Sequence, residues 1–104
     1  MNKYRIEITK PAEDDLSKIV MYIAKELLEP SIAERTINKI SGAIITLEEF
    51  PYRNALVAEE RLAKRGIRKI IIDNYIAFYI VEENLKKVTV IRILYGKRDW
   101  MNLL

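Results

Sequence analysis

An uncharged apolar run in the second half of the chain constrains the fold more than any other feature. It extends from Tyr75 to Val81 and contains only aromatic, β-branched and small apolar residues, which favour β-strands. A strand with no polar residue on either side has both faces covered in a folded protein. We therefore predict an interior strand at residues 75–81, with packed layers above and below the sheet.

Two similar runs flank this strand. Ile67 to Ile72 precedes it across Asp73-Asn74, and Val88 to Leu94 follows it after a short, mostly polar stretch at residues 83–86. Both flanking runs include charged side chains, as strands with a solvated side do. Connections this short join neighbouring antiparallel strands. The three runs therefore predict an antiparallel meander.

The first half of the chain has the spacing of one strand and two helices. Polar and apolar residues alternate from Lys3 to Thr9, the pattern of a half-buried strand. Apolar residues then recur every three or four positions from Ala12 to Leu27 and from Ala33 to Leu47, which indicates amphipathic helices. Only a few residues separate these segments, so the two helices are predicted to fold into an antiparallel hairpin.

Prolines and a capping pattern mark the ends of these helices. Pro11 suits a first helical turn because its missing N–H has no partner there. Pro30 ends the first helix, since it restricts the residue before it. Ser31 is predicted to cap the second helix in a capping box with Glu34, and Pro51 stops that helix.

The order strand, helix hairpin and three strands predicts an α+β fold. One antiparallel sheet then carries the helix pair on one face. Residues 51–66 have no clear period and are predicted to form a loop, with a helical turn at residues 61–65. The length of 104 residues suits a single domain over residues 1–104.

The composition excludes several kinds of chemistry. The sequence has no Cys and no His, so it has no disulfide, no thiol nucleophile, no Ser-His-Asp triad and no ordinary zinc site. Any catalysis must use Lys, Arg, Tyr, Glu or Asp, and we expect no metal and no cofactor.

No run approaches the roughly 18 apolar residues that span a bilayer. We therefore expect a cytoplasmic protein without membrane contact.

Charge is distributed unevenly along the chain. Residues 1–60 contain 8 basic and 11 acidic residues, a net charge of −3, whereas residues 61–104 contain 10 basic and 4 acidic residues, a net charge of +6. A one-sided basic surface is typical of proteins that bind a polyanion, such as nucleic acid or an acidic protein segment. Solvated charge that keeps a small domain soluble explains the pattern equally well.

Five short segments extend over nearly the whole chain in a distinctive order. They are Ala12-x-x-Asp15-Leu16-x-x-Ile19-x-x-Tyr22-Ile23, Leu47-x-x-Phe50-Pro51, Gly66-Ile67-Arg68, Asn74-Tyr75-x-x-Phe78-Tyr79 and Val90-Ile91-Arg92-Ile93-Leu94-Tyr95-Gly96-x-Arg98-Asp99. None is diagnostic by itself. Together, at these separations, they resemble the RelE/ParE superfamily of bacterial toxins from type II toxin–antitoxin systems. The resemblance implies a cognate antitoxin as partner.

The resemblance also implies one of two activities. ParE-like members inhibit DNA gyrase without being nucleases, whereas RelE-like members cleave messenger RNA on the ribosome. The nuclease members carry basic residues where this chain has Ile70 and Ile76, and an apolar side chain cannot stabilise the charge of a developing phosphorane. The run from Arg92 to Tyr95 is also similar to the ParE side.

We therefore expect a ParE-like toxin that arrests growth by binding DNA gyrase rather than by catalysis. Two alternatives stay open. One is a RelE-like, ribosome-dependent messenger RNA endoribonuclease. The other is a degenerate, non-toxic domain that is kept for its interaction with an antitoxin or DNA.

The candidate site residues are mostly basic. In the endoribonuclease alternative, Arg68 and Arg98 bind phosphate, and Tyr95 or Lys97 assists proton transfer. Target or nucleic-acid binding is assigned to five residues: Arg65, Arg68, Arg92, Lys97 and Arg98. Of these, Arg68, Arg92 and Arg98 are expected to share one basic surface if their strands are adjacent.

Several of these residues have a structural interpretation as well. Arg92 is alternatively held in an ion pair with Glu7 or Asp73. Glu59 and Glu60 are either candidates for a general base or solvated loop charges.

An apolar segment follows the last strand. It either packs onto the sheet or offers a surface to a partner, and the resemblance favours antitoxin binding by Trp100, Met101, Leu103 and Leu104. Three tyrosines are interpreted mainly as packing residues: Tyr22, Tyr52 and Tyr95.

Overall fold

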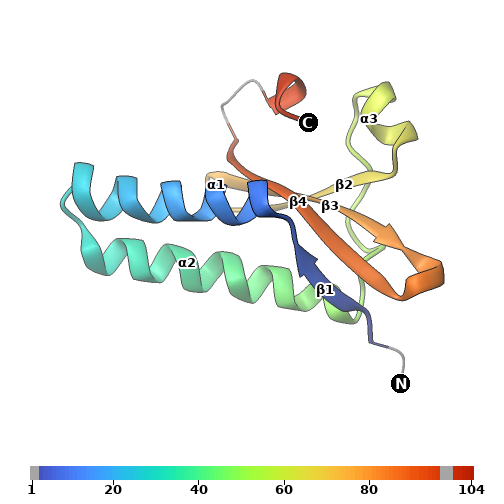
Figure 1. The fold of residues 1–104 in the computed structure, drawn as a ribbon, viewed down its shortest axis with the longest axis horizontal. Coiled ribbons are helices and arrows are strands. Elements are labelled where there is room, and N and C mark those ends of the chain that lie inside the picture. The colour runs from blue at the N-terminus through green and yellow to red at the C-terminus, as the bar shows by residue number, and fades with distance from the viewer. Residues whose placement is uncertain (1–2, 97–99) are drawn as a thin grey trace.

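A sheet forms the centre of the molecule, with a hairpin of helices on one of its faces (Figure 1). The structure is a computed structural model that describes residues 3–96 and 100–104, without the side chain of Met101. Its strands are β1 (Arg5–Ile8), β2 (Ile67–Ile72), β3 (Tyr75–Glu82) and β4 (Lys87–Tyr95). Its α-helices are α1 (Lys10–Met21), α2 (Pro30–Ile45) and α3 (Glu60–Lys64). Shorter turns are the π-helix η1 (Tyr22–Glu26) and the 3₁₀ turns η2 (Thr46–Glu48), η3 (Glu83–Leu85) and η4 (Trp100–Asn102).

The strands lie in the order β1-β4-β3-β2. The pairs β2/β3 and β3/β4 are antiparallel, which confirms the predicted meander. β1 runs parallel to β4, so the sheet is mixed and the expectation of a wholly antiparallel sheet was wrong. The reason is topological. Two helices bring the chain back to the start of β1, where the Tyr4 N–H donates to the Glu48 carbonyl at 2.8 Å. β2 therefore runs in the same direction as β1. Each of the two hairpins reverses the chain once, so β4 runs in that direction again.

The interior position of β3 is confirmed by the burial of both its faces. Ala77 and Tyr79 belong to a buried cluster beneath the helices, while Ile76 and Phe78 belong to a second cluster on the opposite face. Both clusters are apolar, which is the physical reason that residues 75–81 of this strand contain no charge.

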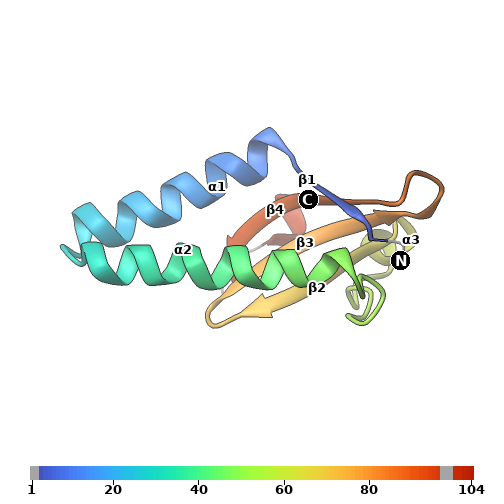
Figure 2. The ribbon, with the colours of Figure 1, turned by 90° about the horizontal axis from the view of Figure 1, so that it is seen from below.

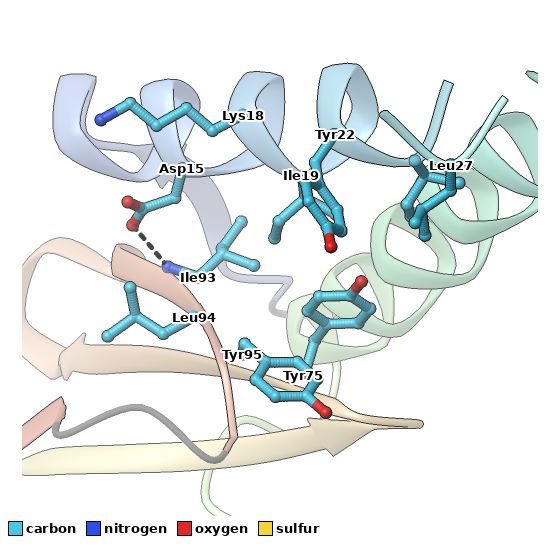
Figure 3. Close-up of a pocket in the computed structure, with 10 residues that line it drawn as sticks. Asp15, Lys18, Ile19, Tyr22, Leu27, Tyr75, Ile93, Leu94 and Tyr95 are labelled. Carbon is cyan, nitrogen blue, oxygen red and sulfur yellow. Dashed lines mark hydrogen bonds between the residues drawn. The ribbon is translucent and has the colours of Figure 1, made fainter. Parts of the chain in front are cut away.

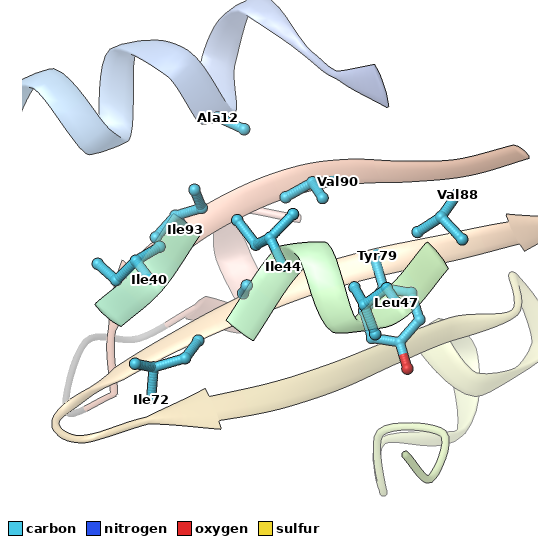
Figure 4. Packing of buried hydrophobic residues seen from close by; sticks show 10 residues of the cluster. Ala12, Ile40, Ile44, Leu47, Ile72, Tyr79, Val88, Val90 and Ile93 are labelled. Carbon is cyan, nitrogen blue, oxygen red and sulfur yellow. The ribbon is translucent and has the colours of Figure 1, made fainter. Parts of the chain in front are cut away.

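The two clusters are covered by different parts of the chain. Figure 2 shows α1 and α2 running side by side over one face of the sheet. Figure 4 shows Ile40, Ile44 and Leu47 lying in front of this face of the sheet, in the same cluster as Tyr79 and the β4 valines. The opposite face is covered by Leu62 of α3 and by Trp100 of η4. The second cover consists of short segments, whereas the first consists of long helices.

The ends of the helices agree with the sequence in part. Thr9 caps α1 by accepting a hydrogen bond from the Ala12 N–H at 3.2 Å. The π-helix η1 continues α1 to Glu26, and Leu28, whose φ is +54°, lies in the short connection before Pro30. The predicted capping box at Ser31 was wrong. α2 begins at Pro30, and Glu29 is its N-cap without a side-chain bond. Proline has a preset φ and no N–H, so the N-cap lies two residues earlier than predicted, and Ser31 is inside the first turn.

An exposed carboxylate joins three segments at one end of the sheet. Glu83 accepts hydrogen bonds from the Tyr4 hydroxyl at 2.6 Å and the Tyr52 hydroxyl at 2.9 Å. Lys86 pairs with its other oxygen. The hydrogen bond from Lys86, followed by those from the two tyrosines, lowers the pKa of Glu83 from 4.5 to about 2. The charged form of Glu83 therefore binds the residue before β1 and the loop after α2 to the β3–β4 turn.

We expect Glu83→Gln to alter the acid end of the pH–stability profile. The pKa of Glu83 is depressed in the folded state, so its contribution is present above about pH 4.5 and is lost as the pH falls toward 2. The variant should melt below the native protein at pH 6, and the two melting temperatures should converge as the pH approaches 2. Thermal unfolding by circular dichroism measures this. Glu60→Gln, which removes an exposed carboxylate paired with Lys64, is the control. If both variants follow the same profile, Glu83 has no special role.

Candidate functional site

Arg68 lies on β2 and is held by the loop that follows α2. Its Nη1 donates to the Asn54 carbonyl at 2.7 Å, and its guanidinium carbon lies 5.0 Å from the centre of the Tyr52 ring. In the sheet Arg68 is paired with Tyr79, whose hydroxyl donates to the Pro51 carbonyl at 2.6 Å. Arg68 is thus half-buried over this loop, with part of its hydrogen-bonding capacity already used within the protein.

Arg92 lies on β4 and forms a bidentate ion pair. Its Nε and Nη2 donate to the two carboxylate oxygens of Asp15 at 2.7 and 2.8 Å. This agrees with the structural interpretation of Arg92, but the predicted partners were wrong. Glu7 pairs with Arg5 and Lys87, and Asp73 pairs with Lys39. The hydrogen bonds to Asp15 raise the pKa of Arg92 above its usual value, so its charge is permanent.

The structure does not bring Arg68 and Arg92 onto one basic surface. Arg92 is paired with Phe78, and Phe78 is paired across the next strand with Lys69 rather than Arg68. Because neighbouring residues of a strand point to opposite faces, Arg68 lies on the face opposite Lys69. Each guanidinium also has partners of its own. The expectation of a joint Arg68–Arg92 surface was therefore wrong.

The other predicted basic residues are placed differently. Arg65 is exposed at the end of α3, and its Nη1 donates to the Leu104 carbonyl oxygen at 2.9 Å. Lys97 and Arg98 lie outside the described residues, so their assignment to target binding or catalysis stays a prediction.

Asp15 is a site residue that the sequence analysis missed. It is only 6% exposed, although it is acidic and lies on α1. Its position was a signal: Asp15 is three residues after Ala12 and four before Ile19, on the apolar side of the helix. A third hydrogen bond reaches it from the Ile93 N–H at 2.9 Å. β1 pairs with β4 only as far as Ile8 and Val90, so Asp15 satisfies a main-chain donor just beyond the end of that pairing.

The C-terminal tail, defined here as Trp100–Leu104, packs on the face of the sheet opposite the helices. The Trp100 ring lies 5.0 Å from the Phe78 ring, centre to centre, and the Lys69 Nζ lies 6.0 Å from the Trp100 ring. Leu103 and Leu104 pack against the same cluster. All three apolar side chains stay half-exposed. The tail therefore packs onto the sheet and still presents apolar surface, while the Met101 side chain lies outside the described part.

A groove of about 610 Å³ opens between the first helix and the ends of β3 and β4 (Figure 3). Ile19, Ile23 and Leu27 come from the helical side, and Ile93 and Leu94 from the sheet. Tyr22, Tyr75 and Tyr95 also line it, with Lys18 and Asp15. An apolar lining with a few polar groups is typical of a binding site.

Two tyrosines of the groove contact each other on its sheet side. Tyr95 contacts Tyr75 edge to face at 5.9 Å between ring centres. Burial, followed by the proximity of Tyr95 and Tyr22, raises the pKa of Tyr75. Its hydroxyl therefore stays protonated at neutral pH. Tyr22, interpreted above as a packing residue, is 56% exposed and offers its ring to the groove.

The two loop glutamates have structural partners. Glu59 caps α3 by accepting a hydrogen bond from the Leu62 N–H at 2.9 Å, and it pairs with Arg61. The bond from Leu62, then that from Arg61, lowers the pKa of Glu59. Glu60 pairs with Lys64. These contacts support a structural interpretation over a general base.

Across residues 3–96 and 100–104, no three acidic side chains converge in a way that could hold a metal ion.

No helix in the described part of the chain is long and apolar enough to cross a membrane. Among curated proteins, a sequence search found no significant match.

Solved structures with a similar fold are toxin–antitoxin proteins. A chain of the chromosomal ParDE toxin–antitoxin system of P. aeruginosa has a TM-score of 0.76 at 19% identity, with 93% of this chain and 100% of that chain covered. The toxin–antitoxin complex RelBE2 of Mycobacterium tuberculosis gives 0.64 at 20% identity, covering 91% and 93%. The intact E. coli RelBE toxin–antitoxin complex gives 0.61 at 17% identity, covering 91% and 99%. At these identities the likeness concerns the fold.

The sequence of the chain also matches a family. The model that describes the ParE toxin of the type II toxin–antitoxin system parDE matches residues 6–100. That range includes β1 from Ile6 onward, the other three strands, the helix hairpin, the Asp15–Arg92 pair and the groove. It follows that the chain belongs to the ParE toxin family of type II toxin–antitoxin systems.

Proposed function

We propose that this chain arrests growth by inhibiting DNA gyrase through binding, without catalysing a reaction. Membership of the ParE toxin family supports the proposal. The observation that carries it is the packing of the two isoleucines that stand where nuclease members have basic residues. Ile76 is 8% exposed in the cluster beneath the tail, and Ile70 packs against the cluster beneath the helices.

This packing leaves positions 70 and 76 without the charges that the nuclease members carry there. Stabilising a phosphorane requires cations directed at one point. Ile70 and Ile76 face opposite sides of the sheet and have no charge. Arg68 lies two residues before Ile70 on the same face of β2, but its guanidinium is turned to Asn54 and Tyr52. The arrangement supports a protein-binding toxin over a ribonuclease.

We also propose that a cognate antitoxin neutralises this chain in the cytoplasm. Two similar structures were solved as toxin–antitoxin complexes, which supports such a partner here. The half-exposed apolar tail and the tyrosine-lined groove both offer surface of the kind that a partner segment covers. Trp100, Leu103 and Leu104 would provide part of this contact, together with Met101.

Induced expression without antitoxin tests the activity. We expect DNA breaks with intact transcripts in cells, and inhibition of gyrase supercoiling by the purified chain, because a gyrase inhibitor acts on DNA and leaves messenger RNA uncut. Primer extension on transcripts and a supercoiling assay measure the two effects, with an empty vector as control.

Other outcomes would replace this proposal. Codon-positioned transcript cuts with intact DNA would mean an endoribonuclease, in which case Arg68→Ala should abolish cleavage without unfolding the protein. Normal growth at full expression would indicate a non-toxic interaction domain.

A further inference from the structure

We propose that Asp15 is a positioning residue that, through Arg92, holds the C-terminal tail in place on the sheet. The two residues are far apart in sequence and come from different layers of the fold. Asp15 lies on α1, on the helix-covered face, whereas the tail covers the opposite face. Arg92 has hydrogen bonds to both, so it connects the helix layer with the tail.

The connection passes the edge of β4 where β1 no longer covers it. β1 ends its pairing at Ile8 and Val90, and Arg92 is two residues further along β4. Its Nε and Nη2 bind the Asp15 carboxylate, while its Nη1 donates to the Leu103 carbonyl at 3.0 Å. One guanidinium group thus binds two layers of the protein.

Asp15 determines where this guanidinium lies. A bidentate pair between a carboxylate and an arginine fixes both the distance and the plane of the guanidinium. The Asp15 side chain is 7% exposed and that of Arg92 is 22% exposed, so water competes little for the pair. The Ile93 N–H holds the carboxylate in turn. Arg92 therefore presents its remaining donor to the tail in one orientation.

The other contacts of the tail are less constrained. Arg65 reaches the Leu104 carbonyl from an exposed position, and Lys69 lies over the Trp100 ring at 6.0 Å. Both are long side chains at the surface, which lose rotamer freedom when they bind. Phe78 gives the tail an apolar base, but apolar packing is not directional. Among these contacts, the hydrogen bond from Arg92 to the Leu103 carbonyl is directional, and its donor is held by a largely buried ion pair with Asp15.

This inference rests on the proposed function only where it concerns toxicity. If the tail is part of the surface presented to gyrase, Asp15 sets the geometry of that surface without touching the target.

The single tryptophan of the chain makes the proposal directly testable. Trp100 is the only Trp in the sequence and lies in the tail, so its fluorescence reports tail packing while far-UV circular dichroism reports the rest of the fold. Asp15→Asn keeps the size of the side chain and removes its charge. We expect a red shift of Trp100 emission and stronger quenching by acrylamide, with the dichroism spectrum unchanged.

Matched variants separate positioning from general stability. Asp14→Asn removes an exposed carboxylate from the adjacent position of α1, where it pairs with Lys10, and should leave Trp100 emission unchanged. In an Arg92→Gln background, Asp15→Asn should add no further shift, because its effect passes through Arg92. If Asp15→Asn unfolds, Arg92→Lys replaces it as the test, since lysine keeps the charge and loses the bidentate geometry. Native Trp100 emission in both folded variants would overturn the proposal.

Gyrase inhibition by the same proteins tests the link to toxicity. We expect Asp15→Asn to weaken inhibition about tenfold or more, the scale of one lost charge-assisted hydrogen bond. A fluorescence shift with native inhibition would contradict the link to the target while leaving tail positioning supported. If the native protein itself does not inhibit gyrase, the proposed function fails, and the fluorescence result still decides the role of Asp15.

Discussion

Phe78→Ala is expected to destabilise the protein by about 3–5 kcal/mol, the usual cost of removing a buried phenylalanine side chain. Phe78 is fully buried at the centre of β3 and packs against Trp100. Its removal leaves a cavity between the sheet and the tail, which cannot close because β3 is held by strands on both sides. Chemical denaturation followed by far-UV circular dichroism measures the free energy of unfolding.

The chain contains a matched control for this substitution. Its only other phenylalanine, Phe50, is 62% exposed in the turn after η2. Phe50→Ala should change the free energy of unfolding by less than about 0.5 kcal/mol, as surface substitutions usually do. Equal effects of the two substitutions would contradict the assignment of Phe78 to the core.

Ile76→Arg is expected to destabilise the protein by about 3–5 kcal/mol, the scale for an uncompensated charge in a protein interior. The substitution introduces a basic residue at a position where nuclease relatives are expected to have one. Here the side chain is 8% exposed and lies against Gly96, where an added Cβ would be 3.5 Å from the Ile76 Cδ1. We therefore expect loss of stability without any gain of transcript cleavage, measured by denaturation and primer extension.

Ile71→Arg is the control for this second substitution. Ile71 is paired with Ile76 on the neighbouring strand and points to the same face, but it is 64% exposed. An arginine there keeps its charge in water and should be tolerated within about 0.5 kcal/mol. A stable Ile76→Arg variant that cleaves transcripts would refute the argument that packing at this position excludes ribonuclease activity.

The parts of the fold that were predictable depend on residues close in sequence. The uncharged run at residues 75–81 identified an interior strand because a charge on either face would be buried. The helix hairpin followed from the spacing of apolar residues, and the antiparallel meander from short connections. The error at Ser31 was also local. Pro30 and Ser31 are adjacent, and each is a typical residue for the start of a helix; α2 begins at the proline.

The candidate site was less predictable because its contacts join residues far apart in sequence. The type of interaction at Arg92, a structural ion pair, could be anticipated from a charge on an otherwise apolar strand. Its partner could not, because Glu7 and Asp73 were expected, whereas the contact with Asp15 depends on how α1 packs against β4. Arg68 illustrates the same limit, because strand register, not spacing along the chain, separates it from Arg92.

By itself the sequence determined the elements of this protein, their order and the two-sided burial of β3, because periodicity and proline position act within a few residues of the chain. It also carried the superfamily resemblance, and the family comparison places the chain with the ParE toxins. Tertiary structure alone decided that β1 runs parallel to β4 and that Asp15 binds Arg92 across 77 positions. Such contacts arise only when separate elements are folded onto one another, so their partners depend on topology and register.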